Sequence, residues 1–470
     1  MSGTVISRII AFAAIPFLSR LFTPADFGVL ALFGMVTSTL ATLVTWRYEA
    51  AIILPERDED AINILGVCIG LNTITSLILG IIFFYYSRSI SIFFGAPELT
   101  PWLYWSPLCI WSMGIFTALR IWNSRTDNFK WISIANVGDV GALVITQLGL
   151  GLLFRGILSG LILGPYFARI SGMLILLVHT LRTHGSLIRS SLNLQAGYKL
   201  AVRYARFPLY DLPASLLSGL SREIPTGILG IFFVTQWVGL YSIANRILSV
   251  PIQVVSGAIA EVYLPVAQDA KNSARLDHFT LSIFNRLLGI SFTPMLVVAI
   301  AAPELITVVL GKQWIVAGAF LQALTPSLLI AFIATPIDAV FSVLERQQEK
   351  LVFNTSLFVT RLISLIIGGL LGDALFAVIM YSASGTIFWA LQCFWTLRLS
   401  TIKSQVIFRQ IFNEALRTLP FIIFITGVTL IHQGSPRRIV FGLCITLTVF
   451  LALRWKEFLG PGSLKNPQTT

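Results

Sequence analysis

Charged residues are scarce in this sequence. Only 11% of its 470 residues are Asp, Glu, Lys or Arg, whereas 56% are hydrophobic and the mean hydropathy is +0.83. A soluble domain carries about 25% charged residues, because charge has to cover its surface. A soluble globular protein is therefore excluded, and the composition predicts an all-α polytopic membrane protein.

Cysteine and histidine are also rare. The four cysteines and four histidines are dispersed and lack metal-ligand spacing: Cys68, Cys109, Cys393, Cys444, His179, His184, His278 and His432. Apolar surroundings favour reduced, buried thiols, so neither a disulfide framework nor a metal site is expected. No GxxxxGK[ST] sequence is present, which excludes ATP hydrolysis through that motif. The Asp58-Glu59-Asp60 run imitates the acidic metal-binding pattern of sugar-nucleotide transferases, but we interpret it as a solvated loop. We therefore expect no cofactor.

Apolar runs separated by short polar breaks dominate the chain. They predict about fourteen spans, since about 20 helical residues cross a hydrocarbon core. The predicted spans are residues 4–22, 27–46, 61–86, 100–119, 131–153, 157–181, 208–233, 238–260, 280–302, 316–343, 351–371, 374–397, 415–432 and 437–453.

The net charge of +12 comes from basic residues scattered through these breaks. We interpret these residues as determinants of membrane orientation and as contacts to anionic membrane lipids. Nucleic acid is therefore not an expected partner. Lys and Arg concentrate in alternate breaks, above all in the long one from Arg182 to Arg206. This bias predicts that both termini are cytoplasmic.

The chain contains an internal repeat whose two copies are separated by roughly half its length. LFTPADFG at residues 21–28 resembles FFVTQWVG at residues 232–239, and each copy lies between the first two spans of a six-span half. Because each half has an even number of spans, both halves enter the membrane from the same side, and the repeat is parallel. Repeat folds of this kind place the substrate near the midplane of the membrane, between the lobes. Mapping the second copy onto the first predicts a first helix that starts a few residues before Met1.

The repeat predicts four parts of the chain. They are an N-lobe at residues 1–182, a basic cytoplasmic linker at 183–206, a C-lobe at 207–398, and two further helices with a tail at 399–470.

Two predicted spans carry polar stripes along one helical face. The stripes are Asp211, Ser215, Ser218 and Arg222 in the first, and Ser242, Arg246, Ser249, Gln253 and Ser256 in the second. An arginine near mid-depth is costly in lipid, so two such helices predict a hydrated, cationic cavity. The alternative is that both arginines hold helices together by pairing with Asp211, Glu223 or backbone carbonyls.

Other charges within spans extend this prediction. Arg8 occupies nearly the same repeat position as Arg222, and several guanidinium groups favour an anionic ligand, above all phosphate. Alternatively, Arg8 snorkels to the inner surface. Asp139 and Arg361 occupy nearly matching repeat positions, which predicts an inter-lobe latch, a protonation site or a structural ion pair.

Several segments resemble a known family. PFLSRLFTPADFGVLALF, RYEAAIILPERDEDA, RYARFPLYDLP and WVGLYSIANRILSVP are similar to sequences of bacterial lipid-linked oligosaccharide flippases. These are the O-antigen and exopolysaccharide translocases of the multidrug/oligosaccharidyl-lipid/polysaccharide exporter superfamily. The resemblance implies a two-lobed, V-shaped bundle of twelve core helices in which spans 1, 2, 7 and 8 line a cationic cavity. It also implies a polyprenyl diphosphate oligosaccharide as cargo and an ion gradient, of H⁺ or Na⁺, as energy source.

The resulting hypothesis is a transporter, not an enzyme, in the bacterial inner membrane. It flips a lipid-linked glycan by alternating access, with glycan assembly proteins as potential partners. Arg222 and Arg246 grip the diphosphate, and Arg8, Asp211, Ser218 and Gln253 complete the substrate site. A multidrug exporter of the same superfamily is one alternative, although cationic drugs require an anionic cavity. A membrane-embedded glycan polymerase or ligase is another, although such enzymes generally need a sizeable outer loop.

Overall fold

A computed structural model of the chain describes residues 2–154, 158–272 and 275–459. Within these ranges every regular element is a helix, as the composition predicted. Ten of the described helical segments are long and apolar enough to cross a membrane. The predicted polytopic all-α membrane fold is confirmed.

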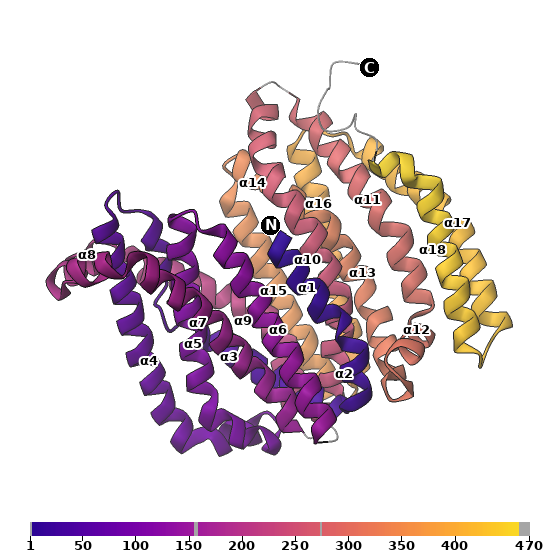
Figure 1. The fold of residues 1–470 in the computed structure, drawn as a ribbon. Coiled ribbons are helices and arrows are strands. Elements are labelled where there is room, and N and C mark those ends of the chain that lie inside the picture. The colour runs from indigo at the N-terminus through magenta and orange to yellow at the C-terminus, as the bar shows by residue number, and fades with distance from the viewer. Residues whose placement is uncertain (1, 155–157, 273–274, 460–470) are drawn as a thin grey trace. The chain divides into compact units, whose positions relative to one another are not determined.

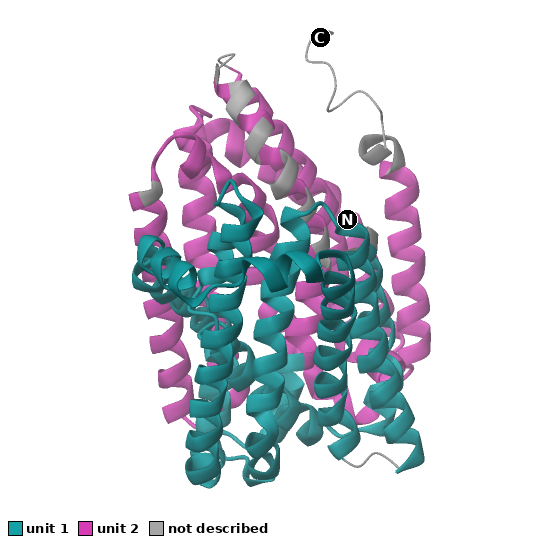
Figure 2. Ribbon diagram, turned by 60° about the vertical axis from the view of Figure 1, so that its left-hand side comes forward, with its two compact units in different colours: residues 1–242 teal, residues 243–470 magenta. Residues whose placement is uncertain are grey.

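The helices group into two compact units, residues 1–242 and 243–470, shown in two colours in Figure 2. The six-span lobes and the linker remain predictions, because this division follows packing within the chain rather than the repeat. Unit 1 holds α1 (Ser2–Ala13), α2 (Ile15–Leu21), α3 (Pro24–Ala41), η1 (Tyr48–Ile53), α4 (Asp58–Phe93), η2 (Pro97–Leu99), α5 (Thr100–Arg125), α6 (Phe129–Leu153), α7 (Leu158–Ser191), α8 (Leu194–Arg203), η3 (Phe207–Asp211), α9 (Leu212–Phe232) and the start of α10 (Thr235–Asn272).

Unit 2 begins within α10 and contains the remaining helices. They are α11 (Leu276–Ile300), α12 (Ala302–Val309), η4 (Lys312–Trp314), α13 (Ile315–Ile337), α14 (Ala339–Val343), α15 (Gln347–Leu370), α16 (Ala374–Leu399), α17 (Ser404–Ile431) and α18 (Pro436–Leu459). The last two form the adjacent yellow pair in Figure 1. Each unit has its own apolar core, built around Trp122 in unit 1 and around Phe284 and Leu287 in unit 2.

The second predicted span ends earlier than its apolar run. α3 stops at Ala41, and the chain then turns through Trp46 and Arg47, whose φ angles are 51° and 63°. Left-handed backbone at two bulky residues is unfavourable, so surrounding contacts have to hold it. Downstream, the acidic run at Asp58 is not the solvated loop we expected. It forms the first turn of α4, where negative charge is favoured by the helix dipole.

The predicted linker contains a helix that periodicity had not revealed. Asn193 caps α8 by accepting from the backbone N–H of Gln195 at 2.8 Å, and α8 runs across the start of α4 (Figure 1). Its buried face includes Leu200. The Tyr48 hydroxyl donates to the carbonyl of Ala201 at 3.0 Å, and burial raises the pKa of Tyr48.

The opposite face of α8 is apolar and uncovered. Leu194, Tyr198 and Val202 are 95%, 72% and 59% exposed and lie one turn apart. Lys199 and Arg203 adjoin this stripe in sequence. A short helix with one apolar face and basic flanks is typical of a segment that lies in the membrane interface.

The two copies of the repeated segment meet at their glycines. A Cβ on Gly28 of α3 would lie 1.8 Å from the carbonyl oxygen of Thr235, and one on Gly239 of α10 would lie 1.8 Å from that of Pro24. The contact is reciprocal, because Thr235 occupies the position of Pro24 in the other copy. Only glycine permits backbone to approach backbone this closely. The repeat seen in the sequence therefore has a structural counterpart where the two helices begin.

Candidate functional site

The polar stripe predicted for span 7 lies on α9 and on the turn before it. Asp211 ends η3, a single π-helical turn, and Ser218 and Arg222 are exposed along α9. π-Helical turns occur frequently at functional sites. A charged face on a membrane-spanning helix is stable only if it meets water or protein. The stripe is therefore a candidate surface for a polar ligand.

Asp211 pairs with Arg47, a basic residue in a break between predicted spans that the sequence had suggested only as a determinant of membrane orientation. Its Oδ2 accepts from Nε of Arg47 at 2.7 Å, and Nη1 of Arg47 donates to Oε1 of Glu49 at 2.9 Å. Glu49 is buried and also accepts from the Thr45 hydroxyl at 2.6 Å. These contacts fix the left-handed turn at Arg47. Asp211 thus meets a guanidinium group directly, and Arg47 joins the candidate site.

A second polar contact joins α3 to α9. The Ser38 hydroxyl donates to Oε1 of Glu223 at 3.3 Å. Glu223 follows Arg222 in sequence, so the two side chains project about 100° apart around the helix. The Glu223 carboxylate therefore lies on the face of α9 that packs against α3, while Arg222 lies on the exposed face.

The second predicted stripe lies on α10. Arg246 is half-buried, Gln253 is exposed, and Ser249 donates to Oδ1 of Asn245 at 3.2 Å. Among the residues that the structure describes, Arg246 has no carboxylate partner. The side chain of Ser256 lies outside what is described.

Arg8 lies half-buried on α1 and likewise has no ion-pair partner in the described ranges. α1 packs along α6, with Gly3 close to Ser133. A guanidinium group retained without a carboxylate in a membrane helix is a candidate anion ligand.

Asp139 and Arg361 have local partners in different units. Both carboxylate oxygens of Asp139 accept from Nη1 of Arg169 at 3.3 Å, between α6 and α7. Arg361 donates to the Ser327 hydroxyl at 3.2 Å, and its Cζ lies 4.7 Å from the ring centroid of Tyr381. Asp139 thus makes an ion pair within unit 1. The latch between Asp139 and Arg361 stays a prediction.

The side chains of these stripes offer positive charge and hydrogen-bond donors to a ligand. Arg222 belongs to unit 1 and Arg246 to unit 2, and their convergence on one cavity remains a prediction. Across the described residues, no group of three or more His, Cys, Asp or Glu gathers as metal ligands. Guanidinium, hydroxyl and amide groups together suit an anionic, hydroxyl-rich ligand.

Comparison with known proteins identifies the family. Residues 17–319, which include all of α3, α9 and α10, match the polysaccharide biosynthesis protein family. The chain belongs to this family. The match confirms the resemblance expected from the RYEAAIILPERDEDA and WVGLYSIANRILSVP segments.

One curated relative in the comparison is the succinoglycan biosynthesis transport protein ExoT of Rhizobium meliloti (strain 1021). It is 23% identical over 313 residues, which is 64% of this chain. The match spans 59% of the relative's own length.

Two solved structures are similar in fold. The lipid II flippase MurJ, in an inward closed conformation, has a TM-score of 0.76 at 13% identity, covering 97% of this chain and 98% of its own. An inward-facing multidrug resistance MATE family transporter of the MOP superfamily has a TM-score of 0.57 at 15% identity, covering 85% and 93%. The fold is therefore that of polytopic membrane transporters.

Proposed function

We propose that this chain moves a lipid-linked oligosaccharide across the bacterial inner membrane by alternating access. The family match and the transporter fold support it. The single observation that carries it is the pair of arginines in the predicted spans 208–233 and 238–260: Arg222 is exposed on α9, and Arg246 on α10 has no carboxylate partner among the described residues. Such charge is costly in lipid and suits an anionic head group.

In this proposal the cargo is a polyprenyl diphosphate glycan. Arg222 and Arg246 bind the diphosphate through paired N–H donors. Arg8, Ser218 and Gln253 contact the glycan or the phosphates. Asp211 positions Arg47 beside the same surface, while the prenyl chain stays in lipid. Transport draws on a gradient of H⁺ or Na⁺, and both termini are cytoplasmic.

The decisive experiment combines deletion with two substitutions. Deletion should abolish surface polysaccharide and accumulate a lipid-linked intermediate on the cytoplasmic leaflet. Arg222→Ala and Arg246→Ala should each reduce export roughly tenfold or more at normal protein level, because each removes charge-assisted hydrogen bonds to phosphate. Arg57→Ala, which removes an exposed arginine at the start of α4, is the matched control. Normal polysaccharide in both site variants would refute the site assignment.

A multidrug exporter is the second candidate, favoured by the fold shared with the MATE transporter. It predicts that deletion sensitises cells to cationic drugs while surface polysaccharide stays normal. The cationic side chains of α9 and α10 favour the glycan carrier over this alternative.

A further inference from the structure

A cavity in unit 2 lies between α11 and the C-terminal helices α17 and α18, and none of the proposed substrate residues lines it. Its volume is about 330 Å³. It is lined by Ser282, Asn285, Arg286, Leu288, Gly289, Gln410, Asn413, Glu414, Arg417 and Arg454. Most of these side chains are polar, although the helices that carry them are apolar enough to span a membrane.

The polar lining has helical spacing on both facing helices. On α11 it comes from residues 282, 285, 286 and 289, and on α17 from residues 410, 413, 414 and 417. Both sets repeat the intervals i, i+3, i+4 and i+7, so each forms one stripe. Because the lining residues recur with helical spacing on both facing helices, the cavity is a regular feature of the sequence and not a packing defect.

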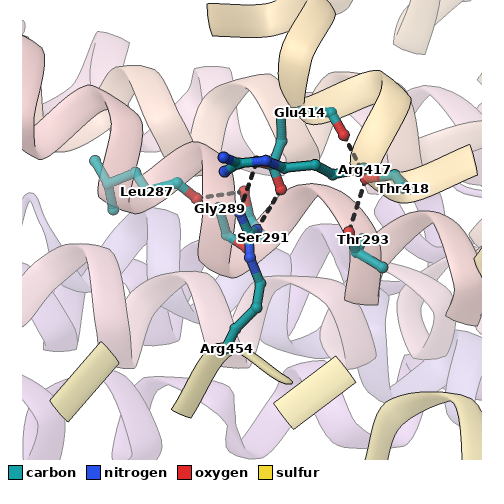
Figure 3. A network of polar contacts seen from close by, with 8 residues as sticks. All are labelled: Leu287, Gly289, Ser291, Thr293, Glu414, Arg417, Thr418 and Arg454. Atoms are coloured by element: carbon teal, nitrogen blue, oxygen red, sulfur yellow. Dashed lines mark hydrogen bonds and ion pairs between the residues drawn. The ribbon is translucent and has the colours of Figure 1, made fainter. Parts of the chain in front are cut away.

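Arg454 of α18 and Glu414 of α17 both line this cavity, and Figure 3 shows that their side chains pair directly. Their side chains are only 11% and 6% exposed. Nη2 of Arg454 donates to Oε2 of Glu414 at 2.9 Å, and Nη1 donates to both Oε1 of Glu414 and the Gly289 carbonyl. A bidentate pair leaves this carboxylate little capacity for another cation.

Arg417 lies at the open side of the cavity. Its side chain is 64% exposed, and its Nη1 is 3.9 Å from Oε2 of Glu414, beyond hydrogen-bond distance. The described lining therefore holds three arginines and one carboxylate. The lining residues therefore carry more positive than negative charge, and the exposed Arg417 side chain is accessible to a ligand.

Helix lengths place the cavity at one boundary of the hydrocarbon core. About 20 residues cross that core, so counting back from the end of α17 at Ile431 reaches about residue 411. Counting forward from the start of α18 at Pro436 reaches about residue 456. Glu414, Arg417 and Arg454 all lie near these limits. By this count all three lie just inside the core, from where an arginine side chain can extend to the lipid phosphates, in the leaflet that the basic-residue bias assigns to the cytoplasm.

We propose that this cavity binds the phosphodiester head group of an anionic membrane phospholipid. Basic pockets between membrane helices on the cytoplasmic side are suited to such groups. Arg417 makes the contact from the lipid-facing side, and the Glu414–Arg454 pair holds α17 and α18 in place behind it. The bound lipid would join the C-terminal helix pair to α11.

The test measures phospholipid retention by the full-length protein in detergent, by native mass spectrometry. Phosphatidylglycerol is compared with phosphatidylcholine at equal concentration, and inorganic phosphate and a polyprenyl diphosphate serve as competitors. We expect selective retention of phosphatidylglycerol. Arg417→Gln should weaken it roughly tenfold, the effect of one charge-assisted hydrogen bond, and Arg417→Lys should recover part of the loss.

Arg409→Gln is the matched control, because Arg409 is exposed on the same helix and does not line the cavity. It should bind as the unmodified protein does. Thermal unfolding checks that every variant is folded. Equal retention with and without Arg417 overturns the proposal. Displacement by inorganic phosphate would instead assign the site to a soluble anion, and displacement only by the polyprenyl diphosphate would assign it to the cargo; either result overturns it too.

Discussion

At the scale of single residues, charges in the membrane-spanning helices fall into two groups. Asp139 with Arg169, and Glu414 with Arg454, are paired inside their own units. Arg222 and Arg246 are not held in this way, and they are the proposed ligands of the cargo. Sequence spacing found Arg222 and Arg246 because each lies in a polar stripe that interrupts an apolar run. It could not find the pairs, whose members come from different helices.

The Glu414–Arg454 pair gives a stability prediction. Glu414→Gln keeps the shape of the side chain but leaves Arg454 buried with an uncompensated charge. It should lower the free energy of unfolding by about 3 kcal/mol. Chemical or thermal unfolding in detergent measures the change.

Two further variants check the cause. Glu59→Gln, at an exposed carboxylate, should change stability by less than about 0.5 kcal/mol. The double variant E414M/R454M removes both charges and should recover most of the loss. If it is no more stable than the single variant, the loss does not come from unpaired charge.

The Arg47–Asp211 pair gives a smaller effect. Both side chains are partly exposed, so solvent screens their attraction. A double-mutant cycle with Arg47→Met and Asp211→Asn should give a coupling energy of about 1 kcal/mol, and 0.5 M salt should reduce it. A coupling energy of zero would mean that the contact contributes nothing to stability.

At the scale of helices, the spacing of apolar residues and the capping residues explain where most helices begin and end. Thr23 begins α3 with a capping box, in which Asp26 accepts from the Thr23 backbone N–H at 2.8 Å. The end of α3 was not predictable, because residues 42–46 are as apolar as the helix before them. Their turn is stabilised by tertiary contacts of Arg47 and Glu49. α8 was missed because its one apolar stripe lies within a basic break.

The close contact between α3 and α10 at Gly28 and Gly239 gives a prediction at this scale. Gly28→Ala or Gly239→Ala places a methyl group where a backbone carbonyl now lies, so the helices have to separate. Each should destabilise the protein by about 1–3 kcal/mol, the usual effect of overpacking, measured by thermal unfolding.

Gly34→Ala is the matched control on the same helix. A Cβ at Gly34 has no heavy atom within 4 Å, and alanine favours helix by up to about 1 kcal/mol. This variant should be neutral or stabilising. A similar loss at Gly28 and Gly34 would mean that the close crossing is not the cause.

At the scale of the whole molecule, the sequence predicted the fold class, whereas the substrate site stays a prediction. Apolar runs, their breaks and the 21–28 and 232–239 repeat are local signals that hydropathy and self-comparison can detect. The cavity at Arg417 was within reach of the sequence, through the spacing of residues 410, 413, 414 and 417. Its partners on α11 and α18 were not, because spacing within one helix does not show which helix it faces.

Orientation gives the last prediction. If both termini are cytoplasmic, the break between α17 and α18 lies outside and the one between α16 and α17 lies inside. In a variant with its own cysteines replaced by serine, Ser435→Cys should react with a membrane-impermeant maleimide in cells whose outer membrane alone is permeabilised. Thr401→Cys should react only after the inner membrane is also opened. The reverse pattern would overturn the orientation.

The uncovered stripe of α8 has a consequence for how unit 1 responds to its bilayer. Leu194, Tyr198 and Val202 find a favourable place only at one depth, the narrow zone between water and acyl chains. If α8 lies in that zone, it fixes the depth of the adjoining end of α4 in the bilayer. A change in bilayer thickness would then be accommodated at the opposite ends of the long helices of unit 1, and the polar turn at Arg47 and Asp211 would keep its depth.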